Sequence, residues 1–317
     1  MTQEMTSAAA SGTWTLGDLR VHRIGFGAMR LPQDGTAFDP DAPPGDRDRA
    51  IAVLRRALEL GVNHIDTAAF YFSRLRSANE LINRALAPYP DDLVIATKVG
   101  PGRDASGAWL PHATPDLLRG QVEENLRQLG RDHLDLVNLR IVGTDSIAER
   151  FGALAELREA GLIRHLGLSN VQPHQLAEAR AIAPVVCVQN PYGLGVRPEQ
   201  EEFVRSCGEQ GVAFVPFYSI AGAGREAGVR AQAGAAAGAQ AGQGTDAAVL
   251  SVAQAHGASP AQVRLAWTLH LGEHVLAIPG TGNPDHLAAN VAAGALRLSE
   301  DEMRLLDTAH RSAGPTG

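Results

Sequence analysis

Residues 25–30, Gly-Phe-Gly-Ala-Met-Arg, decide between the two folds that alternating strands and helices allow. The glycines of this stretch lie at the end of a short apolar segment, residues 22–29, that we predict to be the first strand. In a doubly wound sheet the turn after this strand normally reads GxGxxG, whose third glycine lets helix and strand pack closely. Arg30 stands where that third glycine would be. The sequence therefore favours a (β/α)8 barrel.

Strand and helix patterns alternate along the rest of the chain. Apolar residues recur at helical spacing over 47–61, Gly61 can end that helix in the left-handed conformation, and NHIDTA begins the next strand. Continuing in this way gives about eight strand–helix units, which is the content of one barrel of roughly 250 residues. We predict an α/β fold: a single (β/α)8 TIM barrel with an N-terminal β-hairpin and an extra C-terminal helix.

The domain boundaries follow from where this alternation starts and where it is interrupted. We predict a flexible N-terminus over residues 1–13 and one barrel domain over 14–312. Residues 221–244 are almost entirely Ala and Gly and follow the seventh predicted strand, on the face where barrel enzymes keep their sites. We expect an Ala/Gly-rich loop over 221–245, either a disordered insertion or a mobile lid over a ligand.

Composition excludes several classes of partner. The net charge of -7 argues against nucleic acid, which requires clustered Lys and Arg. No apolar run approaches the roughly 20 residues of a membrane span, and the N-terminus does not resemble a signal peptide. The two cysteines, Cys187 and Cys207, fit no metal-ligand spacing, so we expect no metal site. We predict a soluble cytoplasmic protein, and the sequence leaves its oligomeric state open.

Polar residues stand at the ends of nearly all the central predicted strands. Because the carboxyl ends of barrel strands meet at one face, these side chains are expected to converge on one pocket. They are Asp66 and Tyr71 after strand two, Lys98 after strand three, Arg140 after strand four, Ser169 and Asn170 after strand five, and Gln189 and Asn190 after strand six.

Three of these residues form a plausible general acid. A tyrosine hydroxyl has a pKa near 10, too high for easy proton donation at neutral pH. The ammonium group of Lys98 would lower the pKa of Tyr71 by stabilising its phenolate, and Asp66 would keep the lysine charged and oriented. Such a tuned donor is what the reduction of a carbonyl by hydride requires.

Six motifs in this order resemble those of the aldo-keto reductases: GVNHIDTAAFY, ATKVG, LDLVNLR, LGLSN, VCVQNPY and IPGTGNPDHLAAN. The resemblance runs from about residue 14 to 310. It implies a (β/α)8 barrel that binds NADP(H) across the strand ends and reduces a small-molecule carbonyl substrate. It also implies that Asp66, Tyr71 and Lys98 are three of four catalytic residues.

The resemblance further implies which residues bind the cofactor. Ser169, Asn170 and Gln189 match residues that hold the nicotinamide carboxamide, Phe217 in VPFYS matches the ring that stacks on the nicotinamide, with Tyr218 beside it, and Gly280, Thr281, His286 and Asn290 fall in the segment around the adenosine 2′-phosphate. Gly280 and His286 replace basic residues that often clamp this phosphate, which weakens the expected preference for NADPH. NADPH remains the expected cofactor, with NADH as the alternative.

Arg140 departs from the family pattern, which usually has histidine five positions after the equivalent of Asp135. A guanidinium stays charged and cannot shuttle protons, but it can donate hydrogen bonds to a substrate oxygen. Alternatively, Arg140 is a salt-bridge residue beside the site. The motif DHLDLVNLRIV around it resembles a bacterial subgroup that reduces pyridoxal to pyridoxine, which implies pyridoxal as the substrate.

Two further residues are candidates for the substrate pocket: Met29 after the first strand, and Trp109 on the loop after the third. Trp109 could equally pack that loop against the barrel. Other functions also remain open. The chain could be a ketoreductase of sugar or secondary metabolism, a broad carbonyl reductase, or an NADP-binding regulatory subunit with little turnover.

Overall fold

The computed structural model describes residues 7–220 and 241–312, without the side chains of 241–243. Residues 1–6, the first part of the predicted flexible N-terminus, and residues 221–240, most of the predicted Ala/Gly-rich loop, lie outside the described residues.

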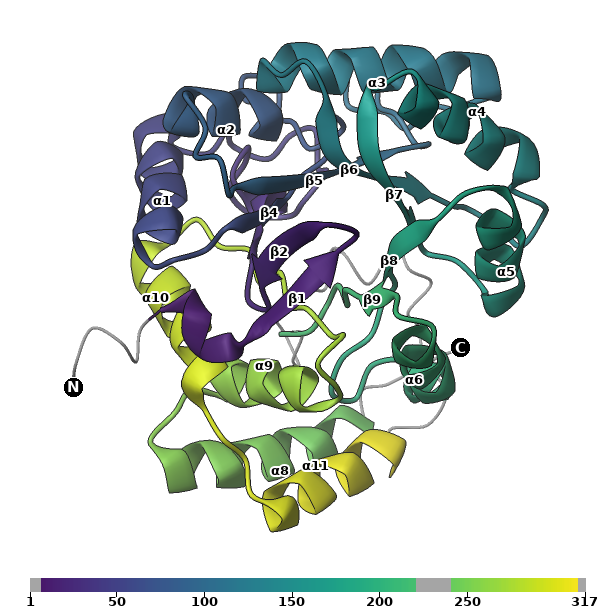
Figure 1. Cartoon of the computed structure of the whole chain (residues 1–317). Coiled ribbons are helices and arrows are strands. Elements are labelled where there is room, and N and C mark those ends of the chain that lie inside the picture. The colour runs from purple at the N-terminus through teal and green to yellow at the C-terminus, as the bar shows by residue number, and fades with distance from the viewer. Residues whose placement is uncertain (1–6, 221–240, 313–317) are drawn as a thin grey trace.

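The centre of the fold is a curled sheet of seven parallel strands in the order β3-β4-β5-β6-β7-β8-β9 (Figure 1). The strands are β3 (Phe26–Gly27), β4 (His64–Asp66), β5 (Val94–Val99), β6 (Leu134–Arg140), β7 (Ile163–Ser169), β8 (Val185–Gln189) and β9 (Ala213–Phe214). Parallel bridges from Val275 to Phe214 and from Ala277 to Ile24 close the sheet on itself. The predicted eighth strand, HVLAIPG, thus completes the barrel, and the predicted fold class is confirmed.

The helices lie around this sheet (Figure 1). They are α1 (Arg47–Glu59), α2 (Ala78–Leu86), α3 (Pro115–Leu129), α4 (Ala148–Glu159), α5 (Pro173–Ile182), α6 (Glu201–Glu209), α8 (Ala241–His256), α9 (Pro260–His270), α10 (Pro284–Ala292) and α11 (Glu300–Ser312), with 3-10 turns η2 (Ala8–Ser11), η3 (Ala28–Arg30), η4 (Pro198–Gln200) and η5 (Ala293–Ala295). In the described part of the chain, none is long and apolar enough to cross a bilayer.

Local sequence signals explain most of these boundaries. Helix α3 starts with Thr114 at the N-cap and Pro115 at its first turn, and it ends on Gly130 in the left-handed conformation, with φ 63°. The extra C-terminal helix is α11, as predicted. Helix α8, in contrast, was not predicted, because it begins inside the Ala/Gly-rich segment, where the alternation of apolar and polar residues is lost.

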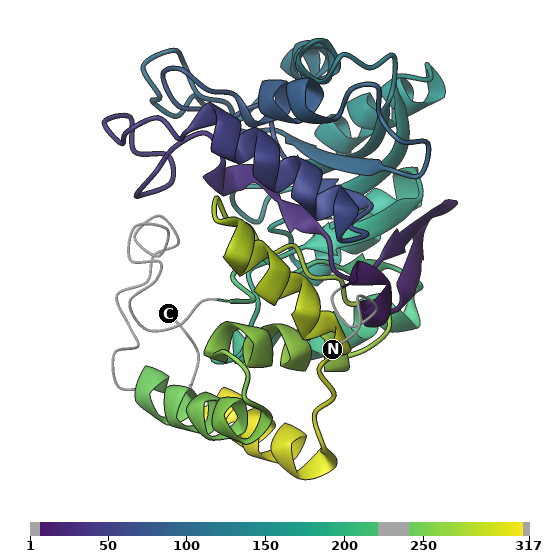
Figure 2. The same cartoon turned by 90° about the vertical axis from the view of Figure 1, so that its left-hand side faces the viewer.

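An antiparallel hairpin, β1 (Thr13–Leu16) and β2 (Leu19–His22), covers one end of the barrel (Figure 2). Leu16 and Val21 pack into the barrel interior with Leu136 and its neighbours. The predicted first strand, residues 22–29, is therefore wrong in detail, because His22 still belongs to the hairpin. The long loops after β3 and β5 lie at the opposite end, which leaves that end for a site (Figure 2).

His310 ties the C-terminal helix α11 to the barrel. Its Nδ1 accepts a hydrogen bond from the Gly195 amide at 3.0 Å, so its Nε2 carries the proton and donates to the Tyr192 hydroxyl at 3.1 Å. Both ring nitrogens are thus satisfied in the neutral form, and the side chain is buried. Burial lowers the pKa of His310 to about 4, because a charged ring would lose its hydration and meet the Gly195 N–H with a second proton.

This arrangement predicts a loss of stability in mild acid. Unfolded His310 titrates near 6.5, so the unfolded state binds more protons below that pH, and stability falls as the pH drops from about 6.5 to about 4. The neutral, buried His310 contributes about 3 kcal/mol to the free energy of unfolding at neutral pH, and this is the amount lost in acid. Urea unfolding of wild type and His310→Gln across this pH range should show a smaller acid-induced loss in the variant. The same change at exposed His174 should leave the acid-induced loss of stability as large as in wild type. An equal loss in the two variants would show that His310 is not its source.

Candidate active site

The predicted site residues share one face of the barrel strands. Side chains alternate along a strand, so in β5 Lys98 points to the same side as Val94 and Ala96, which line the barrel interior. The same alternation turns Asp66, Arg140, Ser169 and Gln189 inward at the carboxyl ends of β4, β6, β7 and β8. Register joins them around the rim, since Arg140 pairs with Ser169 and Ser169 with Gln189.

The centre of this rim is a buried ion pair. Lys98 Nζ donates to Asp66 Oδ1 at 2.5 Å, and both side chains are at most 4% exposed. Lys98 also donates to the Thr67 carbonyl at 3.1 Å, and its Nζ lies 5.0 Å from the centre of the Tyr71 ring. Burial alone would lower the pKa of Lys98, but the charge of Asp66 and the contact with Tyr71 outweigh it, so the pKa is raised. The lysine therefore stays charged.

Gln189 completes the coordination of Asp66. Its Nε2 donates to Asp66 Oδ2 at 2.6 Å, so both carboxylate oxygens are engaged. The other end of the Gln189 amide, Oε1, is buried and finds no hydrogen-bond partner in residues 7–220 and 241–312. An unpaired buried acceptor costs free energy, and a bound N–H donor would remove that cost.

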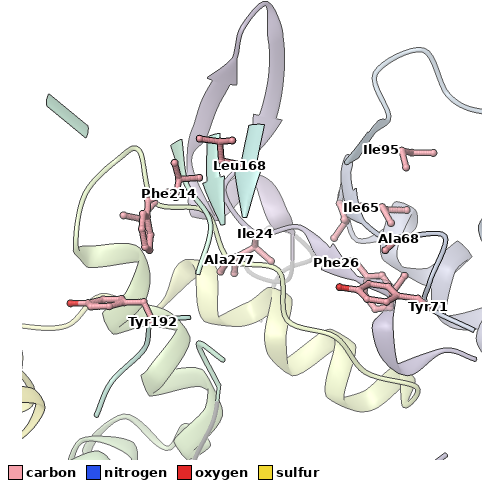
Figure 3. Close-up of a cluster of buried hydrophobic side chains, with 14 of the residues drawn as sticks. Ile24, Phe26, Ile65, Ala68, Tyr71, Ile95, Leu168, Tyr192, Phe214 and Ala277 are labelled. Atoms are coloured by element: carbon pink, nitrogen blue, oxygen red, sulfur yellow. The ribbon is translucent and has the colours of Figure 1, made fainter. Parts of the chain in front are cut away.

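The proposed acid, Tyr71, lies where apolar packing meets this polar rim. It belongs to the main buried cluster together with Phe26, Ile65 and Ala68 (Figure 3). Its ring also contacts Phe70, with the centroids 5.1 Å apart. The ring thus lies between this apolar packing and the ammonium group of Lys98.

Arg140 takes a position that the sequence did not predict. Its guanidinium lies over the Phe217 ring, 4.8 Å from the centroid, and Nη1 donates to Ser169 Oγ at 3.2 Å. No carboxylate within 4.0 Å pairs with Arg140 among the described residues. The alternative that Arg140 is merely a salt-bridge residue therefore finds no support in this geometry.

A further pair of residues, missed in the sequence, fixes the backbone of Arg140. Arg150 donates to His112 Nδ1 at 2.6 Å, so His112 Nε2 carries the proton and donates to the Arg140 carbonyl at 2.6 Å. Burial lowers the pKa of His112, and the charge of Arg150 lowers it further. Gly100 makes room for this contact, since a Cβ there would lie 2.5 Å from the Arg140 carbonyl oxygen.

The loops beside Gln189 are held by their own hydrogen bonds. Asn170 adopts a left-handed conformation, with φ 60°, and its Nδ2 donates to the Ile141 carbonyl at 2.9 Å. Asn190 binds both backbone groups of Val171. Ser169 and Asn170 are thus fixed beside Gln189, since Ser169 pairs with it in the sheet and the Asn170 amide donates to its main-chain carbonyl at 2.8 Å.

Phe217 and Tyr218 follow β9 at the same face. Their ring centroids are 5.0 Å apart, and Phe217 pairs with Pro191 beyond the end of β8. Of the remaining cofactor candidates, Gly280 and Thr281 precede α10, whereas His286 and Asn290 lie within it. There, a Cβ on Gly280 would meet the Gly27 carbonyl at 2.5 Å.

These α10 residues form a second group. No hydrogen bond in the described ranges joins them to Asp66, Lys98 or Gln189.

The two substrate-pocket candidates are placed differently. Met29 is half-buried in η3 and packs against the main hydrophobic cluster. Trp109 is 44% exposed, and its ring lies 5.3 Å from Phe38 and 5.8 Å from Phe70. The Phe38 ring in turn lies 5.8 Å from the Tyr71 ring, so Phe38 connects Trp109 to the proposed acid. The described residues contain no group of three or more potential metal ligands.

Comparison with known proteins agrees with this geometry. Residues 23–311 match the model of the Aldo/keto reductase family. The chain is 42% identical to pyridoxine 4-dehydrogenase of Escherichia coli (strain K12) over 94% of this chain and 98% of that protein. It is 36% identical to an uncharacterised oxidoreductase of Schizosaccharomyces pombe, over 96% and 92% of the two chains.

A solved aldo-keto reductase of Klebsiella pneumoniae in complex with NADPH has the same fold, with a TM-score of 0.75 and 26% identity over 94% of each chain. The sequence motifs, the closed barrel and these matches agree, and the chain belongs to the aldo/keto reductase family.

Proposed function

We propose that this protein reduces an aldehyde to an alcohol with NADPH, that Tyr71 is the general acid, and that pyridoxal, which would become pyridoxine, is the substrate. The observation that carries the proposal is the buried Lys98–Asp66 pair beside Tyr71. The relative named pyridoxine 4-dehydrogenase supports the substrate, because oxidation of pyridoxine is the reverse of this reduction.

The chain's own residues account for the proton. As the carbonyl carbon accepts hydride, its oxygen gains negative charge and takes the proton of the Tyr71 hydroxyl. The phenolate left behind faces the ammonium group of Lys98, which stabilises it. Asp66 keeps the lysine charged and Gln189 orients Asp66, so the acid is preorganised. Solvent then returns the proton to Tyr71.

The residues present fit a reduced nicotinamide. When bound, this cofactor supplies the hydride. The carboxamide N–H₂ of a nicotinamide is the kind of donor that the unpaired, buried Gln189 Oε1 lacks, and Ser169 and Asn170 adjoin Gln189 through the main chain. The ring of Phe217 lies on the same side, with the guanidinium of Arg140 over one of its faces, and it would stack on the nicotinamide with the other. NADPH is the proposed form, supported by the NADPH complex of the Klebsiella pneumoniae enzyme.

Arg140 supports the choice of substrate. Pyridoxal carries a hydroxyl next to its aldehyde, and this group is acidic enough to ionise readily. A permanent cation at the end of β6 can donate to that oxygen while the aldehyde meets Tyr71.

The first test is the loss of NADPH absorbance with pyridoxal, run beside NADH and several ketones. Turnover of ketones alone would contradict pyridoxal as the substrate but would still support carbonyl reduction as the reaction.

Replacing Tyr71 by Phe should remove the general acid and little else. We expect kcat to fall by about 10²–10⁴, the range that general acid catalysis contributes. The Kd for NADPH, from fluorescence titration, should stay within about twofold because the hydroxyl serves the transition state. The matched control is Tyr89→Phe, whose hydroxyl binds the Leu129 carbonyl away from the site, and it should keep wild-type kcat. Weakened NADPH binding with normal kcat would show that the acid is misassigned.

Replacing Arg140 by Met should selectively lower the catalytic efficiency with pyridoxal. Loss of a charged hydrogen bond of about 1.5–3 kcal/mol lowers kcat/KM for pyridoxal roughly 10- to 100-fold. Pyridine-4-carboxaldehyde, which lacks the neighbouring hydroxyl, should lose much less, and steady-state kinetics on the two aldehydes gives the comparison. Equal losses of kcat/KM on the two aldehydes would mean that Arg140 does not bind the hydroxyl of pyridoxal.

A further inference from the structure

Arg103, on the loop after β5, is a buried cation that joins three loops at the open end of the barrel. It is only 9% exposed. Nε donates to the Gly107 carbonyl at 2.9 Å, Nη1 to that of Phe72 at 2.8 Å, and Nη2 to that of Phe38 at 3.2 Å. These carbonyls belong to the loops after β5, β4 and β3, respectively.

Carbonyl groups and aromatic rings, rather than a paired carboxylate, surround the guanidinium of Arg103. Within residues 7–220 and 241–312 no carboxylate oxygen lies within 4.0 Å of its guanidinium. Instead, the guanidinium carbon lies over three rings, 4.7 Å from the centroid of Phe72, 5.5 Å from Phe38 and 5.8 Å from Trp109. Burial lowers the pKa of Arg103, but a guanidinium remains charged at any working pH.

The loop carrying Arg103 is shaped to fit it. Gly107 has φ +89°, and a Cβ there would lie 2.8 Å from Arg103 Nη2. Asp104 Oδ1 accepts from Ser106 N and Ala108 N, which folds the loop back so that Trp109 pairs with Arg103. A glycine and an Asx turn therefore place the guanidinium and the indole side by side.

The same three loops supply a closed circuit of aromatic contacts that includes the proposed acid, Tyr71. Ring centroids are 5.8 Å apart for Phe38 and Tyr71, 5.1 Å for Tyr71 and Phe70, 5.8 Å for Phe70 and Trp109, and 5.3 Å for Trp109 and Phe38. We call Phe38, Phe70 and Trp109 the aromatic wall.

Phe38 is held in this wall at an energetic cost. Its φ is +68°, in the left-handed region that bulky residues rarely adopt. Such strain persists only where the surroundings over-determine it, and it concentrates at functional sites. Arg103 contributes two of the contacts that hold Phe38, because it binds the Phe38 carbonyl and lies over its ring, beside the ring contacts with Tyr71 and Trp109.

We propose that Arg103 is a positioning residue that assembles the aromatic wall beside Tyr71, and that the wall selects carbonyl compounds bearing a flat ring over open-chain aldehydes. The inference rests on the proposed function, because it takes Tyr71 as the group that meets the carbonyl. Rings stack on rings at the spacings seen here, and a wall ordered in advance loses no loop entropy on binding. An open-chain aldehyde gains little from either effect.

The test compares wild type with Arg103→Met, which keeps the apolar stem but removes all five N–H donors and the charge. Kinetics with benzaldehyde and with butanal give the ring preference, defined as the ratio of their kcat/KM values. We expect this ratio to fall about tenfold through a higher KM for benzaldehyde. The kcat for butanal and the Kd for NADPH should stay within about twofold. Arg103→Lys, whose single ammonium cannot reach all three loops, should give an intermediate ratio.

A second variant keeps the test valid if Arg103→Met folds poorly. Trp109→Leu changes a partly exposed ring of the wall and should lower the same ratio by a similar factor. In the double variant the two effects should not add, because both act through the wall. An unchanged ratio in folded Arg103→Met, or in Trp109→Leu, would overturn the proposal.

Hydrogen exchange separates this inference from the proposed function. In Arg103→Met, amides around Phe38, Phe72 and Gly107 should all exchange faster than in wild type, whereas amides of β7 should not change. Faster exchange around Gly107 alone would overturn the role of Arg103 in joining the loops. If wild type reduced no carbonyl compound at all, the proposed function would fail, and the exchange result would still decide whether Arg103 positions the wall.

Discussion

The ion pair between Lys98 and Asp66 is the interaction on which the rest of the site depends. Two charges are held at most 4% exposed, at a desolvation cost of several kcal/mol for each ion. Such a pair contributes little net stability, because that cost offsets most of the attraction between the charges. The barrel retains it by surrounding it with further hydrogen bonds from Gln189 and to the Thr67 carbonyl. Its value is chemical, since it fixes a positive charge beside a tyrosine.

The barrel makes this pair possible through register. Asp66 lies opposite Ala96, and Lys98 stands two residues further on the same face of β5, so the lysine reaches back across the rim to the carboxylate. The hairpin β1–β2 fills the other end with Leu16 and Val21. Polar chemistry is thereby confined to one end, and the apolar interior below it keeps water from the buried charges.

Much of this could be predicted from the sequence, because it depends on local patterns. The alternation of elements predicted the barrel, and the rule that strand ends converge brought Asp66, Lys98 and Gln189 into one group before any coordinates. What the sequence did not reveal depends on contacts between distant segments. Arg140 stacks on Phe217, 77 positions later, and Arg103 binds Phe38, 65 positions earlier. No spacing rule links such residues, and the left-handed conformation of Phe38 leaves no mark in its residue type.

The hydrogen bonds of Arg103 have one more consequence. All of them go to main-chain carbonyls, which every residue type provides, and none goes to a side chain. The identities of residues 38, 70 and 72 can therefore change without removing an acceptor. A barrel built in this way can exchange the side chains that line its entrance while the loops keep their course. New substrate preferences could thus arise by single substitutions, with the proton-donating machinery left untouched.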